Sequence, residues 1–353
     1  MIRFALVGCG RIARRHADLL GKGQIRGAQL AAVCDQDLSR AQKYADEFDV
    51  PCFSDMCEMA QQDYVDGLVV LTESGHHAEH VIELARFGKH LIVEKPMALT
   101  LEDADRMIEA CDRNDVRLFV VKQNRFNRPV VKLREALDAG RFGRMVMGTV
   151  RVRWCRTQAY YDQDAWRGTW ALDGGVLANQ ASHHVDLLEW MMGSVRSVYA
   201  LSSTALVDIE AEDTAVVALR FASGALGVIE ATTAVRPRDL EGSLSLLGER
   251  GAVEIGGFAV NEIRHWHFEN PLAEDDTVLK EFSTNPPNVY GFGHNEYYQH
   301  VVESIENETQ QLVDGLEGRK SLELITAIYE SIETGKEVPL RFSPQRCRLG
   351  ERD

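Results

Sequence analysis

The first third of the chain alternates short apolar segments with stretches of helical periodicity. Segments of strand length occur at 2–7, 29–34, 67–71, 90–93 and 118–121. Between them, 78–87 and 101–114 carry apolar residues at helical spacing, and Thr100 precedes Asp103 by three residues, as at a capped helix N-terminus. Strands that alternate with helices are typical of a parallel, doubly wound sheet. We therefore expect residues 1–122 to form an α/β domain of the Rossmann type.

The pattern changes after residue 122. Val150, Val152 and Trp154 alternate with arginine and cysteine, which is the two-residue period of a strand with one apolar face. Further segments of strand length occur at 195–201, 214–221, 225–231, 243–247 and 252–255, and helical periodicity occurs at 182–192, 296–305 and 321–332. Short glycine-containing turns join several strands, which favours a mostly antiparallel sheet. Residues 123–353 are therefore expected to form a second, α+β domain built on a large sheet.

Composition narrows the class of protein. The chain has 353 residues, the length of about two domains, and no segment reaches the ~18 consecutive apolar residues of a membrane span. The N-terminal apolar segment ends at Gly8, so we expect neither a membrane anchor nor a secretory signal. Seven scattered cysteines without a C-x-x-C pair favour a reducing cytoplasm. The net charge of −15 opposes binding to nucleic acid or anionic lipid, but screening over about 8 Å lets local arginines bind an anionic small molecule.

The segment Gly8-Cys9-Gly10-Arg11-Ile12-Ala13 has a G-x-G-x-x-A pattern between a predicted strand and a predicted helix. Glycines there permit a tight turn and bring backbone amides and the helix N-terminus close to a pyrophosphate. Asp35 ends the next predicted strand, where its carboxylate can accept hydrogen bonds from the ribose hydroxyls of an adenosine. A carboxylate repels a 2′-phosphate, and Gln36 rather than an arginine follows. The pattern predicts NAD rather than NADP; an ordinary turn with a surface aspartate is the alternative.

Two further segments carry groups suited to proton transfer. Glu94-Lys95-Pro96 follows the predicted strand 90–93, at the edge where doubly wound sheets bind ligands. In the second domain, His183 and Asp186 lie three residues apart, on one face of a helix that begins near Ser182. Histidine exchanges a proton near neutral pH and lysine supplies a positive charge. Lys95 and His183 are therefore the candidate catalytic residues.

Other polar segments are expected to have no catalytic role. His76-His77 and His265-Trp266-His267 lack carboxylate or cysteine partners at ligand spacing, so no metal is expected. The charged segment 210–213 is expected to be a solvated turn. A metal centre is thus not among the predicted functions.

The order of these motifs resembles that of the Gfo/Idh/MocA family of sugar oxidoreductases over the whole chain. The matching segments are the glycine loop, 72–77, 88–96 and 174–186. Within the family, the chain resembles the WlbA/WbpB group of UDP-N-acetylglucosaminuronate 3-dehydrogenases at 122–127, 160–162, 166–170, 179–184 and 293–298. One departure concerns the family's Asp-x-Gly-x-His-x-x-Asp signature, because Asn179 and Ala181 replace the first aspartate and the glycine. An asparagine can orient an imidazole but cannot stabilise its cation by charge.

The resemblance implies an NAD-dependent dehydrogenase that oxidises the C3 hydroxyl of UDP-N-acetylglucosaminuronate in bacterial O-antigen (lipopolysaccharide) sugar synthesis. It further implies that the NAD is tightly held and is reoxidised by 2-oxoglutarate, and that the second domain serves substrate binding and assembly into a tetramer or dimer. Cofactor contacts are implied at Gly8, Gly10, Arg11, Ile12, Asp35, Thr72, His77, Glu94 and Lys95. Substrate contacts are implied at Lys95, Arg125, Asn127, Tyr160, Arg167, Asn179, Gln180, His183, His294 and Tyr298.

Physical arguments support parts of this assignment and leave two alternatives open. Arg125, Arg167 and His294 can meet the charges of a pyrophosphate and a carboxylate. A dehydrogenase of a free polyol such as inositol needs no long groove for a nucleotide. A noncatalytic sensor of NAD(H) and sugar needs no proton relay, which the presence of both Lys95 and His183 disfavours. The row of apolar side chains at 150, 152 and 154 presents more apolar surface than a strand usually exposes to solvent. We therefore expect sheet faces to pack between subunits.

Overall fold

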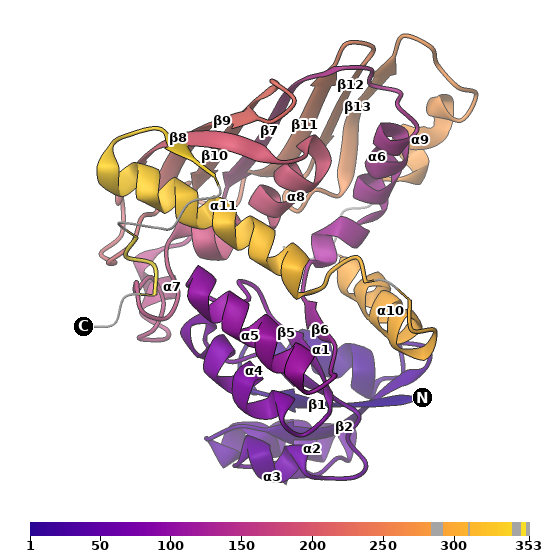
Figure 1. Cartoon of the computed structure of the whole chain (residues 1–353), viewed down its shortest axis with the longest axis vertical. Helices are drawn as coiled ribbons and strands as arrows, with labels where there is room; N and C mark the ends of the chain where they lie inside the picture. Colours follow the sequence, from indigo (N-terminus) through magenta and orange to yellow (C-terminus); the bar gives the residue numbers. More distant parts are fainter. Residues whose placement is uncertain (284–291, 310, 341–346, 351–353) are drawn as a thin grey trace. The chain divides into compact units, whose positions relative to one another are not determined.

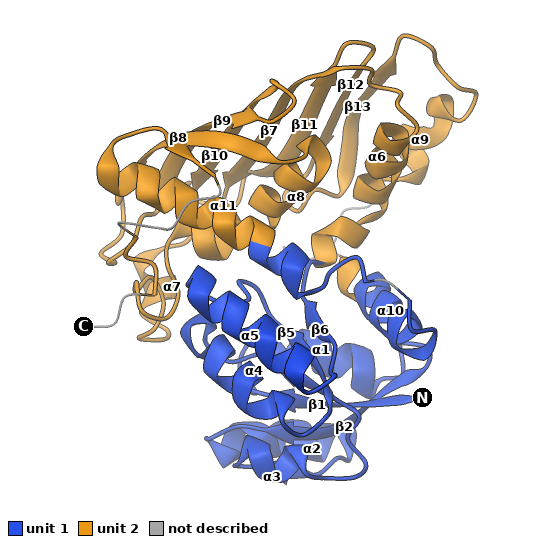
Figure 2. Cartoon of the chain, viewed as in Figure 1, with its two compact units in different colours: residues 1–122, 295–319 blue, residues 123–294, 320–353 orange. Residues whose placement is uncertain are grey.

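The computed structural model describes residues 1–283, 292–309, 311–340 and 347–350 of the chain. The chain forms two compact units (Figure 2): unit 1 contains residues 1–122 and 295–319, and unit 2 contains residues 123–294 and 320–353. The first boundary falls at residue 122, where the sequence pattern changes. Residues 295–319 belong to unit 1, whereas the pattern assigned them to the second domain.

Unit 1 is a doubly wound sheet covered by helices (Figure 1). Its strands are β1 (Ile2–Val7), β2 (Ala28–Cys34), β3 (Cys52–Phe53), β4 (Gly67–Val70), β5 (His90–Val93) and β6 (Leu118–Val120), and its helical segments before residue 122 are α1 (Ala13–Gly21), α2 (Leu38–Phe48), α3 (Met56–Ala60), η1 (Ser74–His76), α4 (His77–Ala85) and α5 (Leu101–Arg113). All strand pairs are parallel in the order β3-β2-β1-β4-β5-β6, with the topological switch at β1 and β4. Residues of β4 are buried throughout, as expected when helices cover both faces. The predicted Rossmann fold is confirmed.

Helix α10 (Gly293–Glu306) explains why the segment 295–319 returns to unit 1. Tyr298 packs edge-on against Phe4 of β1, with ring centroids 5.8 Å apart. Further along, the backbone N–H of Val120 donates to the carbonyl of Val313 at 2.8 Å, which adds this segment to the edge of β6. Helical periodicity reveals the helix but carries no information about which sheet its apolar face covers.

Unit 2 is built on an eight-stranded sheet in the order β13-β12-β11-β7-β10-β9-β8-β14. Its strands are β7 (Met145–Arg153), β8 (Val195–Ser203), β9 (Thr214–Phe221), β10 (Leu226–Thr232), β11 (Glu241–Gly248), β12 (Gly251–Gly256), β13 (Glu262–Phe268) and β14 (Val338–Pro339). Its helical segments are η2 (Gln123–Phe126), α6 (Arg128–Asp138), α7 (Gln158–Tyr161), the π-helical η3 (Val176–Gln180), α8 (Ser182–Met192), α9 (Asp275–Glu281) and most of α11 (Gly315–Thr334). Only β7 and β10 pair in parallel among the described strands of this sheet. The prediction of a mostly antiparallel sheet is confirmed.

The apolar row of β7 faces the interior of unit 2. Val150 and Val152 are fully buried, and α8 packs on β7 and β11. The expectation that this row is left over for another subunit is therefore wrong, because α8 already covers it. The outward row instead carries Arg151 and Arg153, and Arg153 forms ion pairs with Glu230 and with Glu241 on the neighbouring strands.

No helix among the described residues is both long and apolar enough to span a membrane.

Candidate active site

The glycine loop after β1 is shaped by two glycines with different roles. Gly8 has φ of +97°, and a Cβ there would lie 3.0 Å from the carbonyl carbon of Leu71 and 3.1 Å from the nitrogen of Thr72. Only glycine permits both this conformation and the close approach to the end of β4. A Cβ at Gly10 would instead meet open space, with no heavy atom within 4 Å. The loop is therefore tight on the side of the sheet and open beside Gly10.

The N-terminus of α1 follows this open loop. Its N-cap residue is Ile12, which makes no side-chain cap hydrogen bond. The first backbone N–H groups of a helix have no partner within the helix, and they bind an anion readily. The open side of Gly10 and the uncapped turn at Ile12, with the exposed Arg11 between them, fit the pyrophosphate of a dinucleotide.

Asp35 lies directly against the glycine loop. One oxygen of its carboxylate accepts the backbone N–H of Cys9 at 2.8 Å, and the other accepts that of Asp37 at 2.9 Å. These two bonds orient the carboxylate at the end of β2. Each carboxylate oxygen has a further lone pair, so Asp35 can also accept hydrogen bonds from ribose hydroxyls.

The turns after β4 and β5 are tied together by His77, which begins α4. Its Nδ1 lies 2.8 Å from the carbonyl oxygen of Pro96, and its Nε2 lies 3.0 Å from that of Thr72. Burial lowers the pKa of His77, so the ring is neutral at pH 7 and its single N–H donates to one of these carbonyls. Thr72, His77 and Lys95 thus gather at the carboxyl ends of the strands, where such sheets bind ligands.

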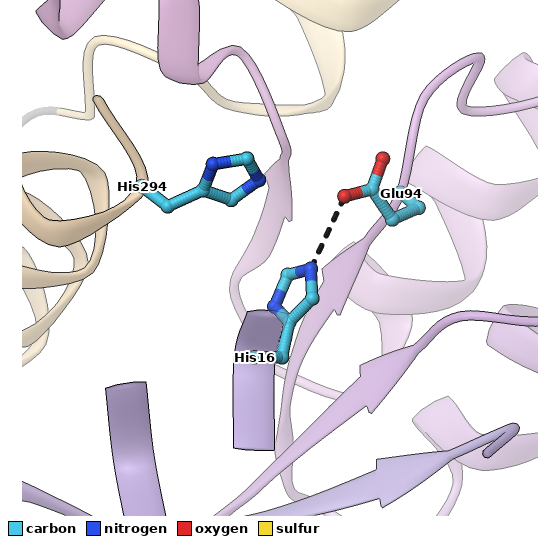
Figure 3. A group of neighbouring side chains, drawn as sticks. All are labelled: His16, Glu94 and His294. Atoms are coloured by element: carbon cyan, nitrogen blue, oxygen red, sulfur yellow. Dashed lines mark hydrogen bonds and ion pairs between the residues drawn. The ribbon is translucent and has the colours of Figure 1, made fainter. Parts of the chain in front are cut away.

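Glu94 fixes the backbone of Lys95 from the interior of unit 1. One carboxylate oxygen of Glu94 lies 3.1 Å from Nε2 of His16 (Figure 3), and the other accepts the backbone N–H of Lys95 at 2.9 Å. His16 in turn contacts the hydroxyl of Tyr298 through Nδ1 at 2.6 Å. The resemblance implies a cofactor contact for Glu94 and a substrate contact for Tyr298. In the structure both side chains belong to a buried hydrogen-bonded chain behind the half-buried Lys95.

In unit 2, His183 lies in the first turn of α8, as the sequence predicts, and Asp186 lies three residues later. Arg125 forms a bidentate ion pair with Asp186, at 2.8 Å from Nε and 2.7 Å from Nη2, and both side chains are 3% exposed. The guanidinium also lies 5.0 Å from the ring centroid of Trp190. The charge of Arg125, which the sequence assigned to the substrate, is therefore balanced within the unit.

Two more of the predicted substrate residues lie in the interior of unit 2. Asn127 is buried and donates to the carbonyl of Ala259 at 3.2 Å. His294, in the first turn of α10, is fully buried. Both positions are buried, and the sequence alone does not show whether a buried side chain contacts a ligand.

Five other side chains of unit 2 form a polar cluster. Nη1 of Arg167 donates to the hydroxyl of Tyr160 at 2.8 Å, and Nε2 of Gln180 donates to the same hydroxyl at 3.1 Å. Nε of Arg156 donates to Oε1 of Gln180 at 3.0 Å. Asn179, beside Gln180, donates its amide to Asp173. The sequence analysis predicted Tyr160, Arg167, Asn179 and Gln180 as site residues but missed Arg156. The signal for Arg156 in the sequence is its positive charge just after the end of a strand.

Comparison with known proteins decides the family. Residues 2–122 match the NAD-binding Rossmann fold of the Gfo/Idh/MocA oxidoreductase family, and residues 134–340 match the family's C-terminal alpha/beta domain. The chain therefore belongs to the Gfo/Idh/MocA oxidoreductase family. It is a dehydrogenase-type enzyme with an NAD-binding domain, as the sequence predicts.

Within the Gfo/Idh/MocA family, the chain is similar to WlbA dehydrogenases. The WlbA structure from Bordetella pertussis, in complex with NADH and UDP-GlcNAcA, is 46% identical with a TM-score of 0.92, covering 97% of this chain and 98% of that chain. The WlbA structure from Chromobacterium violaceum, with the same two ligands, is 44% identical with a TM-score of 0.90, covering 97% and 96%. A myo-inositol 2-dehydrogenase from Thermotoga maritima is 30% identical, covering 96% of this chain and 98% of the relative.

Sequence reasoning missed two buried polar residues of this family member. Gln123, at the start of η2, places its amide Nε2 2.8 Å from Nε2 of His183. Glu212, within the segment expected to be a solvated turn, is 4% exposed and accepts hydrogen bonds from the backbone N–H of Leu177 at 2.9 Å and the hydroxyl of Tyr329 at 3.0 Å. The expectation of a solvated turn is wrong for Glu212 and for the buried Asp213, because both carboxylates satisfy backbone N–H groups of neighbouring segments.

Burial raises the pKa of Glu212 to about 7. Between pH ~4.5 and ~7 the folded state therefore holds a proton that the unfolded state has released, so stability falls as pH rises through this window. Replacing Glu212→Gln should remove this dependence and make the variant more stable than wild type above pH 8, by up to about 3 kcal/mol. Urea unfolding at pH 5 and pH 8 measures the difference. The exposed Glu210 provides a matched control, because Glu210→Gln should keep the wild-type pH dependence of stability. If the stability of wild type and that of Glu212→Gln changed equally between pH 5 and pH 8, the effect of the Glu212 pKa would be excluded.

The geometry around Asp35 predicts the cofactor preference. Replacing Asp35→Ser together with Gln36→Arg removes the carboxylate and adds a cation where a 2′-phosphate would lie. Losing a charge-assisted hydrogen bond costs about 1.5 to 3 kcal/mol, so the affinity for NAD should fall about 10- to 150-fold while that for NADP rises. Fluorescence titration with both dinucleotides measures the shift. If the wild-type protein binds NADP as tightly as NAD, Asp35 does not select the cofactor.

Proposed function

We propose that this protein oxidises the C3 hydroxyl of UDP-N-acetylglucosaminuronate to the 3-keto sugar with NAD. The observation that carries the proposal is the 46% identity, over 97% of the chain, to a WlbA dehydrogenase whose structure holds NADH and UDP-GlcNAcA. The 44% identity to a second WlbA dehydrogenase with the same ligands supports it.

The polar cluster of unit 2 supports an anionic substrate. A UDP-linked uronate brings about three negative charges to a chain whose net charge is −15, so local cations must attract it. Arg156 and Arg167 supply them, and Arg167 is held 4.7 Å from the ring centroid of Tyr160 and 4.5 Å from that of Trp166. A guanidinium has five N–H donors, so Arg167 can contact a ligand in addition to Asp164 and Tyr160. We assign substrate contacts first to Tyr160, Arg167, Asn179 and Gln180.

The chemical step needs a hydride acceptor and a proton acceptor. NAD bound by unit 1 would supply the hydride acceptor. His183 takes the proton of the hydroxyl, directly or by relay, and Lys95 stabilises the negative charge that develops on the oxygen. The Glu94 hydrogen bond to the Lys95 backbone fixes the point from which that side chain extends.

The proposal also covers the pathway, the oxidant that regenerates NAD and the assembly of subunits. We place the reaction in bacterial O-antigen synthesis in the cytoplasm, with 2-oxoglutarate as the oxidant that regenerates NAD. We also propose a homo-oligomer, a tetramer or dimer. Its support is a set of exposed apolar side chains on the strands of unit 2, namely Val146, Tyr199, Leu201, Val216, Leu226 and Leu247.

A second candidate function is oxidation of a free polyol. The 30% identity to a myo-inositol 2-dehydrogenase over 96% of the chain favours it. Such a substrate carries no charge and makes no demand on Arg156 or Arg167.

Substrate tests separate the two candidates and assign Arg167. Purified protein with NAD should produce NADH absorbance with UDP-N-acetylglucosaminuronate and much less with UDP-N-acetylglucosamine, in which a hydroxymethyl group replaces the carboxylate. Arg167→Ala should weaken binding of the uronate about 10- to 150-fold and leave the affinity for NAD unchanged. The exposed arginine on β8 gives a matched control, Arg196→Ala, which should behave as wild type.

Two outcomes contradict the proposal. Equal turnover of the acid and the neutral sugar nucleotide would reject the uronate as the substrate. Oxidation of inositol, with neither nucleotide oxidised, would establish the polyol function instead.

A further inference from the structure

We propose that Glu212 is a positioning residue for the substrate site: it holds the start of η3 and thereby sets where the side chain of Gln180 lies. The inference rests on the proposed function, in which Gln180 contacts the nucleotide sugar. Glu212 is buried and acts through η3 rather than by contact with the substrate. All of the residues that carry the argument belong to unit 2.

Three successive backbone N–H groups at the start of η3 are satisfied through Glu212. The N–H of Val176 donates to the carbonyl oxygen of Glu212 at 2.8 Å, and that of Leu177 donates to its Oε1 at 2.9 Å. The N–H of Gly175 donates to the hydroxyl of Tyr329 at 3.2 Å, and this hydroxyl donates to the same Oε1 at 3.0 Å. The first N–H groups of a helix have no partner within the helix, and Gly175, at the N-cap position, supplies no side-chain bond. Glu212 therefore does for η3 what an N-cap side chain does for an ordinary helix.

The close approach of Glu212 to η3 requires a glycine. A Cβ at Gly175 would overlap both the carboxylate and the carbonyl oxygen of Glu212. The two side-chain hydrogen bonds given above both use Oε1, and Oε2 has no hydrogen-bond partner among the described residues. An amide at this position can make the same two bonds through its oxygen. Glu212→Gln is therefore the conservative replacement.

The segment that carries Glu212 is itself anchored on both sides. The carboxylate of Asp213, the next residue, accepts two backbone N–H groups of the segment that follows β8, at 3.0 and 2.9 Å. On the other side, the N–H of Ala211 donates to the carbonyl oxygen of Gly168, the residue after Arg167, at 3.0 Å. Glu212 is thus a fixed point that lies between the loop of Arg167 and the start of η3.

The far end of η3 enters the polar cluster. Gln180, its last residue, donates through Nε2 to the hydroxyl of Tyr160 at 3.1 Å, and its Oε1 accepts Nε of Arg156 at 3.0 Å. The N–H of Ala181 closes a π-helical turn by donating to the carbonyl of Val176 at 2.7 Å, and such turns are frequent at functional sites. Because η3 is only five residues long, a displacement of its start also displaces Gln180.

Steady-state kinetics test the role in the substrate site. Glu212→Met keeps the backbone bond but removes the carboxylate that accepts two donors, so the KM for UDP-N-acetylglucosaminuronate should rise about 3- to 15-fold and the KM for NAD should not change. Glu212→Gln should keep the wild-type KM for the uronate. Tyr329→Phe removes one of the two donors and should raise this KM about 2- to 5-fold, which tests the role even if Glu212→Met folds poorly. The exposed Glu269 provides the matched control, Glu269→Met, which should behave as wild type.

A double-mutant cycle shows whether Glu212 acts through Gln180. Gln180→Ala alone should also raise the KM for the uronate, because it removes the side chain that Glu212 positions. Adding Glu212→Met to Gln180→Ala should then change the KM by less than about twofold. If the two fold-changes multiplied instead, the two residues would act independently and the inference would be overturned.

Hydrogen exchange gives a readout without substrate. At pH 6, below the pKa of about 7 of Glu212, wild type, Glu212→Gln and Glu212→Met all carry a mostly uncharged side chain at this position. The backbone amides of 176–181 should exchange at least about 10-fold faster in Glu212→Met, whereas those of β11 and β12 should not change. Glu212→Gln and Glu269→Met should show wild-type exchange in both regions. Uniformly faster exchange throughout unit 2 would mean that Glu212 only stabilises the fold, and would contradict a positioning role.

The measurements separate a failure of the inference from a failure of the proposed function. Unchanged exchange at 176–181 in Glu212→Met would overturn the inference, whatever the substrate. Locally faster exchange without a rise in the KM for the uronate would also overturn it, because Glu212 would then not govern the substrate site. If wild type oxidises no nucleotide sugar, the proposed function fails, and locally faster exchange in Glu212→Met would still establish that Glu212 holds η3.

Discussion

Replacing either Lys95 or His183 by alanine should lower turnover by about 100- to 10,000-fold while NAD binding is retained. A hydride can leave the sugar carbon only if the hydroxyl proton also leaves. In the proposed reaction, His183 is the acceptor of that proton and Lys95 is the cation beside the developing charge, so each alanine variant removes one of these two groups. Neither side chain forms part of the glycine loop or contacts Asp35, so the dinucleotide should still bind.

Single-turnover measurements of NADH formation, with dinucleotide affinity measured in parallel, test this expectation. The exposed Lys280 and His267 of unit 2 provide matched controls, since Lys280→Ala and His267→Ala remove the same groups far from either motif in the sequence. Turnover close to wild type in both the Lys95 and the His183 variant would remove the two residues from the mechanism.

The elements of the fold could be predicted because they follow from local patterns. The strands of unit 1 are short apolar segments because helices bury both faces of the sheet, and β1 and β2 end where Gly8 and Asp35 follow. Thr100 caps α5 as predicted, by accepting the backbone N–H of Asp103 at 3.1 Å. The start of α8 at Ser182 could be predicted for the same reason, because it follows from residues that are close in the sequence.

The partners of buried polar side chains could not be predicted in this way. Arg125 and Asp186 are 61 residues apart, and Glu212 is 35 residues from Leu177, whose backbone N–H it accepts. No periodicity links such positions, and a charged residue in an otherwise polar segment looks solvated in sequence. Arg125 and Arg167 therefore appeared equivalent as substrate ligands, although one is enclosed by an ion pair and the other lies in the half-buried polar cluster.

Because Arg125 is enclosed by an ion pair, we expect it to stabilise the fold rather than to bind the substrate. Because Asp186 is as deeply buried as Arg125, Arg125→Ala should remove the guanidinium that pairs with this carboxylate in the interior of unit 2. Removing one partner of a buried pair typically costs about 3 to 5 kcal/mol of folding free energy. Urea unfolding should show this loss, and any fall in activity should follow the loss of folded protein.

The pair itself, rather than the arginine alone, can be tested by replacing both partners. Arg125→Met with Asp186→Leu removes both charges and keeps apolar volume, so the double variant should recover most of the stability that Arg125→Ala loses. If Arg125 instead served mainly to bind the nucleotide sugar, Arg125→Ala would unfold within about 1 kcal/mol of wild type and would show a raised KM for the uronate. A stable Arg125→Ala variant with weakened substrate binding would thus restore the role that the sequence assigned to Arg125, and a destabilised one rescued by the double replacement would make Arg125 a structural partner of the helix that carries His183.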